Sequence, residues 1–191
     1  REVLERAEPP IDVAAVGLMV DETLWGIARE ESFGRAIAAG YLKLFDAAQA
    51  DRLKCYRDVI REGGKRGTTV GRLLAIHLVP VLINGGSTLT ELYLKAVKAM
   101  ETKGTYTLLH PLEALTELLD SEDRRSATVF LDLLIAAFGA DLNYNQCQHL
   151  SRSLPQAARG FVPSKRSWQL EQFLRVVKAD VHLSEAFLTG M

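Results

Sequence analysis

The segment GGKRGTT, residues 63–69, combines glycines, two cations and paired threonines, which are the residue types of a phosphate-binding loop. A Walker A loop needs four variable residues between glycines, then Lys and Ser or Thr, directly after a buried strand. Here Arg66 stands where Ser or Thr would bind Mg²⁺, and the preceding residues have the spacing of an amphipathic helix. The order of residues therefore argues against an NTPase. We interpret Gly63-Gly64 as the C-cap of one helix and Thr68 or Thr69 as the N-cap of the next.

The start of that second helix would carry free backbone N–H groups beside Lys65, Arg66 and Arg72. Helix N-termini attract anions, and cationic side chains form strong hydrogen bonds with them. We therefore predict that these three cations contact an anion or an acidic loop of a protein partner. The alternative is that they are solvated surface cations.

The most amide-rich stretch, residues 143–149, predicts a second contact surface, because polar side chains along one helix can line a groove. We expect Gln146, His149 and Arg152 to contribute to it. The alternative is that the stretch is only the hydrophilic start of a helix that follows Gly139.

Two polar residues lie in apolar surroundings. His77 is on the apolar side of an expected helix, and Asp132 is in the almost apolar stretch 127–138. Buried polar groups must be hydrogen-bonded or paired, so we interpret His77 as a hydrogen-bonded core residue and Asp132 as the one buried acid. The alternative is a ligand-binding or enzymatic domain in which both converge on a pocket between helices. No nucleophile-elbow pattern is present, and we assign no catalytic residue.

The histidines and cysteines lack the spacing of metal ligands. No two histidines are three or four residues apart, and Cys147 and His149, two apart on a helix, would not face each other. Because a zinc site usually needs four such ligands, we expect neither a metal nor a cofactor. Cys55 and Cys147 form no disulfide framework, which favours free thiols and a cytoplasmic location.

The composition is that of an ordinary globular domain: 191 residues, 48% hydrophobic, 25% charged, with a net charge of −1. The near-zero charge argues against a dedicated nucleic-acid binder. Residues 51–72 and 152–178 each carry a basic excess, so nucleic-acid binding is a weaker alternative that requires the two segments to merge into one surface. The longest uncharged run, residues 73–90, contains polar and helix-breaking residues and is too short to cross a membrane.

Apolar residues recur every three or four positions along nearly the whole chain, which predicts eight to ten helices with short joints. The pattern divides residues 11–25 into two pieces. It ends a helix at Gly63, kinks or ends the next at Pro80, and breaks another at Pro155. Residues 121–123 are expected to cap the apolar helix that follows them, which should be central. A short final piece is expected over residues 183–188.

Residues 32–178 resemble HEAT- and TPR-like α-solenoids in helix length, in their short joints and in one proline-containing helix over residues 73–83. The resemblance implies stacked helical pairs that offer a surface to a protein partner. The TPR pattern of Trp, Gly, Tyr, Ala and Pro at fixed offsets is missing, so the repeat family stays open.

We therefore predict one all-α domain over residues 1–191. Its antiparallel helical hairpins would stack as a short α-solenoid or pack as an irregular multi-helix bundle. The chain begins without Met, so we expect a fragment of a longer protein. The expected function is a non-enzymatic scaffold for protein–protein interaction.

Overall fold

The structure is a computed structural model that describes residues 12–181. This part of the chain contains nine α-helices, three 3-10 turns and no strand, which confirms the all-α prediction. The helices are α1 (Val13–Ile27), α2 (Glu31–Asp46), α3 (Leu53–Arg66), α4 (Thr68–Asn84), α5 (Gly86–Glu101), α6 (Leu109–Asp120), α7 (Arg124–Gly139), α8 (Tyr144–Gly160) and α9 (Arg166–Ala179). The 3-10 turns are η1 (Ala50–Arg52), η2 (Thr105–Thr107) and η3 (Pro163–Lys165).

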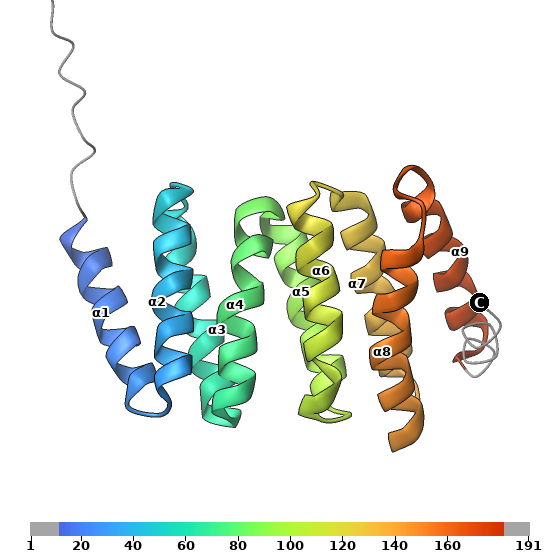
Figure 1. The fold of residues 1–191 in the computed structure, drawn as a ribbon, viewed down its shortest axis with the longest axis horizontal. Helices are drawn as coiled ribbons and strands as arrows, with labels where there is room; N and C mark the ends of the chain where they lie inside the picture. Colours follow the sequence, from blue (N-terminus) through green and yellow to red (C-terminus); the bar gives the residue numbers. More distant parts are fainter. Residues whose placement is uncertain (1–11, 182–191) are drawn as a thin grey trace, which may run out of the picture.

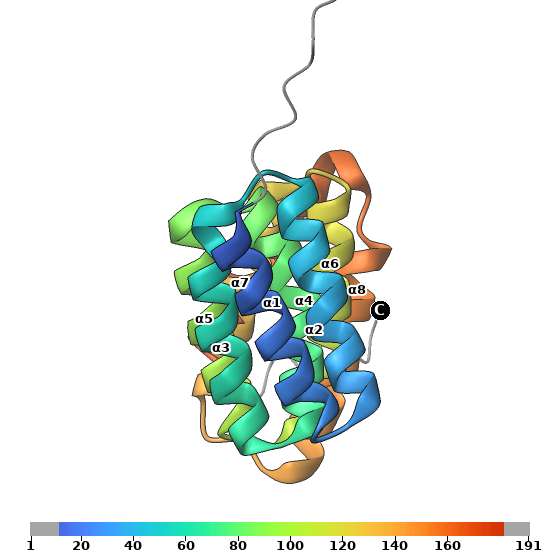
Figure 2. The ribbon, with the colours of Figure 1, turned by 90° about the vertical axis from the view of Figure 1, so that its left-hand side faces the viewer.

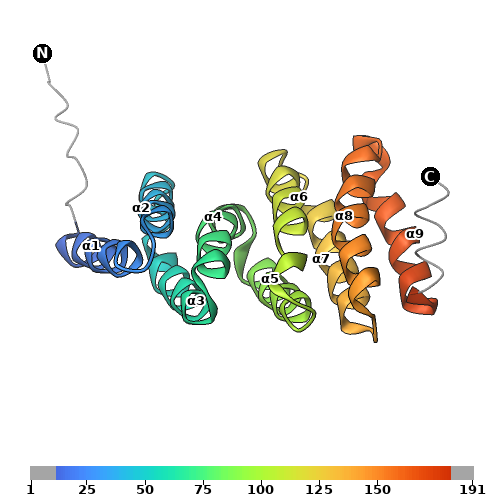
Figure 3. The same cartoon turned by 60° about the horizontal axis from the view of Figure 1, so that its bottom comes forward.

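The helices stand side by side in a row, with α1 at one end and α9 at the other (Figure 1). Helices α2, α4, α6 and α8 form one layer, and α3, α5, α7 and α9 form the second, as the tilted view shows (Figure 3). Within most of each layer a helix packs on the helix two positions further along the chain, and α3–α4 and α6–α7 pack across the layers. The arrangement is therefore solenoid-like.

The core runs along the row between the two layers. Its largest fully buried side chains include Phe33, Tyr41 and Tyr56 near the α1 end and Phe130 and Phe138 on α7. The Tyr56 hydroxyl donates to the Ala75 carbonyl at 2.9 Å, which satisfies a polar atom that would otherwise be costly to bury. Helix α7 packs on α5, α6 and α9, which confirms the expected central place of the apolar helix.

The interpretation of Gly63-Gly64 as a helix C-cap is wrong. Helix α3 continues to Arg66, and the break comes at Gly67, whose φ of 154° favours glycine. Gly63 and Gly64 are buried in the helix because neighbouring groups approach them closely. A Cβ atom on Gly64 would lie 2.6 Å from the Trp25 ring, and one on Gly71 of α4 would lie 2.9 Å from the Gly64 Cα. These glycines allow α3 and α4 to pack closely.

The predicted break at Pro155 is absent, and of the two outcomes predicted for Pro80, a kink or a helix end, the helix end does not occur. Pro155 lies inside α8, which continues to Gly160, and Pro80 lies inside α4 without ending it. Each proline removes one helical hydrogen bond, but Pro155 is buried beside Leu154, and such packing outweighs a weak helix propensity. Residues 13–27 likewise form one helix instead of two pieces.

The expected cap of α7 is confirmed, whereas the N-cap of α4 is Gly67 and not Thr68 or Thr69. Asp123 is the N-cap of α7, and its carboxylate accepts a hydrogen bond from the Ser126 N–H at 3.1 Å. Gly85 is the C-cap of α4. The expected piece over residues 183–188 lies outside the described residues. None of the helices in residues 12–181 has the length and apolar character needed to cross a bilayer.

Candidate functional site

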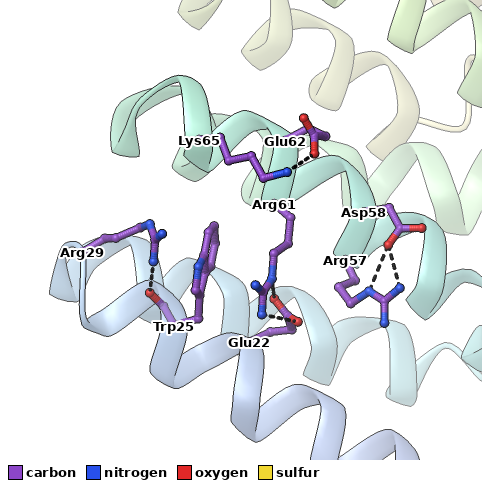
Figure 4. Close-up of polar contacts among 8 residues, drawn as sticks. All are labelled: Glu22, Trp25, Arg29, Arg57, Asp58, Arg61, Glu62 and Lys65. Carbon is purple, nitrogen blue, oxygen red and sulfur yellow. Dashed lines mark hydrogen bonds and ion pairs between the residues drawn. The ribbon is translucent and has the colours of Figure 1, made fainter.

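A groove of about 390 Å³ lies where α3 passes α1, and we call it the α1–α3 groove. These two helices touch only lightly, since each packs mainly on its hairpin partner, and the space between them is lined by charged side chains (Figure 4). The lining residues are Glu22, Arg57, Asp58, Arg61, Glu62 and Lys65.

The base of the groove is an ion pair between Glu22 of α1 and Arg61 of α3. The Arg61 Nε donates to Glu22 Oε2 at 2.6 Å and its Nη2 donates to Glu22 Oε1 at 2.9 Å. The Glu22 side chain is only 4% exposed, because Ala15, Glu22 and Gly26 share the buried face of α1. The hydrogen bonds with Glu22 raise the pKa of the Arg61 guanidinium. The bidentate pair fixes one wall of the groove to the other.

Trp25 extends this base along α1, where its ring lies between two guanidinium groups (Figure 4). The Cζ atoms of Arg29 and Arg61 lie 4.0 and 4.6 Å from the ring centroid, within the range of cation–π attraction. Arg29 also donates to the Trp25 carbonyl at 3.2 Å, and Phe33 contacts the Trp25 ring edge-on. The ring is therefore held in one orientation at the groove.

Three cations, Arg57, Arg61 and Lys65, follow one another along α3 at intervals of four residues. This spacing places them in a row on one side of the helix, about 6 Å apart. Arg57 donates to Asp58 Oδ1 at 2.8 Å, and Lys65 Nζ lies 2.5 Å from Glu62 Oε1. The hydrogen bonds with Asp58 raise the pKa of Arg57. We call Arg57, Arg61 and Lys65 the cation row.

The three cations of the predicted anion site, Lys65, Arg66 and Arg72, each pair with a different acid of the chain itself. Lys65 belongs to the α1–α3 groove, and Arg66 pairs with Glu101 of α5. Arg72 donates to the Ser32 hydroxyl at 3.1 Å and lies 3.5 Å from Glu30.

The start of α4, where that anion was expected, lies beside the Glu30 carboxylate. Hydrogen bonds from the Ser32 and Thr68 hydroxyl groups, together with the charge of Arg72, lower the pKa of Glu30. An acid of the chain itself, Glu30, therefore lies where the sequence predicted an anion or an acidic partner loop.

The second predicted surface lies on α8. Gln146 forms a capping box with Asn143, in which each side chain accepts a hydrogen bond from the other residue's N–H at 3.0 Å. His149 Nε2 contacts the Ser153 hydroxyl at 3.2 Å. Arg152 lines a small hollow of about 100 Å³ with His110, Gln156 and Arg159. Gln146 is thus part of a helix start, whereas His149 and Arg152 are exposed on the helix surface.

His77 is a hydrogen-bonded core residue, as interpreted from the sequence. It is buried on α4, and its Nδ1 lies 2.8 Å from the Thr116 hydroxyl of α6. That hydroxyl donates to the Leu112 carbonyl, so it accepts from His77, and the imidazole carries its proton on Nδ1. Burial lowers the pKa of His77, although the charge of Glu113 opposes the shift.

Asp132 is half-buried on α7, so its interpretation as the one buried acid is wrong. The buried acid is Glu22, at 3% exposure. The largest cavity that we describe, about 620 Å³ between α6, α8 and the start of α9, is lined by neither His77 nor Asp132. Its rim instead holds the ion pairs Arg159–Glu117 and Arg166–Asp123.

Of the groove residues, only Lys65 was among the predicted site residues, and Glu22 and Trp25 also lie outside the basic segments that the sequence singled out. The signal was present, because Ala15, Glu22 and Gly26 lie seven and four residues apart and share one face of a continuous helix. Dividing residues 11–25 into two pieces concealed it.

The two basic segments lie at different places in the row, one on α3 and α4 and the other on α8 and α9 (Figure 1). They do not merge into one surface. Within residues 12–181, no three histidine, cysteine or acidic side chains lie close enough together to hold a metal ion.

No protein-family model, curated protein or solved structure matches this chain.

Proposed function

We propose that this domain is a non-enzymatic helical scaffold for a protein partner, and that the α1–α3 groove receives an extended, acidic segment of that partner. The cation row is the observation that carries the proposal. It runs along the groove beside a tryptophan that two arginines hold in place. Tryptophan and arginine are also the residue types that most often dominate binding energy at protein interfaces.

The spacing of the cation row suits an extended chain. Cations four residues apart on a helix recur about every 6 Å. Side chains on one face of an extended chain recur every second residue, about every 6.6 Å. Acidic side chains at alternate positions of a partner segment would therefore lie in register with the cation row, and those opposite its two ends would meet Arg57 and Lys65.

The present ion pairs divide into fixed and exchangeable ones. Glu22 is buried, so removing Arg61 from it would leave an uncompensated charge. The Arg57–Asp58 and Lys65–Glu62 pairs are exposed to solvent, and such pairs contribute only about 0–1 kcal/mol each. Arg57 and Lys65 can therefore exchange their intramolecular acids for those of a partner at low cost, while Arg61 keeps the groove in shape.

The test is the binding of labelled synthetic peptides, measured by fluorescence anisotropy at low and high salt. One peptide alternates Glu and Thr, a second has the same composition with all Glu residues in one block, and a third alternates Lys and Thr. We expect the alternating acidic peptide to bind most tightly and to weaken as salt rises, because the contacts are between exposed charges. The basic peptide should not bind.

Variants then locate the site. Arg57→Gln with Lys65→Gln should weaken binding at least about tenfold, the loss expected when about 1.4 kcal/mol of contacts is removed. The matched control is Arg35→Gln with Arg125→Gln, which removes two cations from exposed pairs on α2 and α7. The absence of acidic-peptide binding at low salt, or an equal loss in the control, would overturn the proposal.

A further inference from the structure

The outer face of α1 exposes five large aliphatic side chains in one line. Their exposed fractions lie between 37 and 78%. They are five of the twelve large hydrophobic residues that are exposed in the described part of the chain. We call them the α1 stripe: Val13, Val16, Val20, Leu24 and Ile27.

The α1 stripe is a continuous surface on one side of the helix. Its members follow at intervals of three, four, four and three residues, which keeps them on one face over about 21 Å. The opposite face of α1 carries the buried Ala15, Glu22 and Gly26. Helix α1 is thus apolar on the side that faces away from the domain, and neither of its two acids, Asp21 and Glu22, is part of the stripe.

Among the described helices, α1 stands at one end of the row, and Figure 2 shows it in front of the others. No other described helix lies over its outer face. Where an α-solenoid ends in water, its last outer face is normally polar. A contiguous exposed apolar surface instead marks an interface.

We propose that the α1 stripe binds the α1 stripe of a second copy of this chain, with the two helices antiparallel about a twofold axis at Val20. The carrying observation is that the spacing of the stripe is symmetric. The intervals three, four, four and three read the same in both directions, so an antiparallel copy brings Val20 against Val20. The same register places Val13 against Ile27 and Val16 against Leu24.

This self-complementarity is what a closed dimer requires, because both copies use the same surface. A head-to-tail stack would instead need an apolar partner surface at the α9 end. Among its described residues, α9 exposes Trp168 as its one large hydrophobic side chain. The described residues of α9 therefore offer no matching stripe, and the two-fold arrangement is favoured.

Gly17 supports the close approach of a second helix. It lies next to Val13 and Val20 on the outer side of α1, is exposed, and a Cβ atom there would meet no atom within 4 Å. A second helix therefore meets no side chain at this position. One helix pair is a small interface, so we expect dissociation constants of about 1–100 μM.

The first test is the mass of the chain by sedimentation equilibrium between about 1 and about 500 μM, which brackets the expected affinity. Val20→Glu would place two carboxylates together on the axis and should leave the chain monomeric. Val20 is 46% exposed, so folding should persist, which circular dichroism checks. The matched control is Ile76→Glu on α4, at 48% exposure, which should dimerise like the parent.

The second test fixes the orientation by oxidative cross-linking in a Cys55→Ser background, since Cys147 is buried. Val20→Cys should cross-link with itself. Val13→Cys and Ile27→Cys should each form little covalent dimer alone and cross-link when mixed.

Three results would overturn the proposal. They are a chain that stays monomeric at every concentration, Val13→Cys cross-linking efficiently with itself, and loss of the dimer in Ile76→Glu. A monomeric chain would leave the stripe to a different polypeptide.

Discussion

Two buried polar side chains, Glu22 and His77, are satisfied in different ways. Glu22 accepts two hydrogen bonds from Arg61, whereas His77 is neutral and donates to Thr116. A histidine held neutral by burial makes stability depend on pH, because the unfolded chain accepts a proton more readily than the folded one.

The sign follows from the lowered pKa of His77. As pH falls below the ordinary value of 6.5, the unfolded state binds a proton that the folded state does not, so the free energy of unfolding decreases. The loss continues until pH reaches the lower native pKa. His77→Gln, which can still donate to Thr116, should flatten this slope, as measured by urea unfolding between about pH 7 and 5. His149→Gln is the exposed control, and an equal flattening there would contradict the assignment.

The two residues also show what sequence reasoning can reach. His77 was interpreted correctly because its neighbours three and four positions away are apolar, which is local information. Asp132 was interpreted wrongly because the apolar run around it does not reveal which side of α7 meets a neighbour. Burial of one side chain in a helix depends on the facing helix, and the sequence pattern specifies that only through the stripe as a whole.

At the scale of elements, the Gly-Gly pair of α3 lies inside the helix, whereas the sequence pattern indicates a helix end there. A Gly-Gly pair after an amphipathic stretch is typical of a helix end. In the structure Gly63 and Gly64 are interior, and Gly67, one of the chain's positive-φ glycines, is the break. A pattern of residue types cannot separate a cap from a close approach until the partner helix is placed.

Substitution at Gly71 tests this close approach. A Cβ atom there would lie 2.5 Å from Phe33 Cζ and 2.9 Å from the Gly64 Cα, and the latter is backbone that cannot move aside. We expect Gly71→Ala to lower the free energy of unfolding by about 1–3 kcal/mol, the usual cost of overpacking. Gly160→Ala, where no atom lies within 4 Å, is the control in chemical denaturation and should be neutral. A neutral Gly71→Ala would mean that the α3–α4 contact is looser than described.

At the scale of the whole molecule, the row gives each helix a different number of neighbours. Helix α7 packs on α5, α6 and α9, whereas α1 packs mainly on α2 and touches α3 lightly. The sequence predicted the all-helical class, because helical periodicity is local. It left a stacked α-solenoid and an irregular bundle both open, because the order of packing depends on faces that meet over long separations.

Hydrogen exchange should follow this order. We expect the amides of the two end helices, α1 and α9, to exchange faster than those of α4 and α7, because local opening costs least where few neighbours are lost. Hydrogen exchange measured by mass spectrometry on peptides from each helix gives these rates directly. Raising the protein concentration should slow exchange in α1 selectively, and equal rates in α1 and α7 would contradict the one-sided packing of α1.

Helix α1 carries two different faces. Glu22 and Trp25 lie towards α3, and the α1 stripe lies on the side away from it. A ligand that holds one face limits the motion of the other. Linkage then requires reciprocity: if peptide binding in the groove strengthens self-association by some factor, self-association strengthens peptide binding by that same factor. The coupling free energy between these two equilibria would measure how strongly the two faces of α1 influence each other.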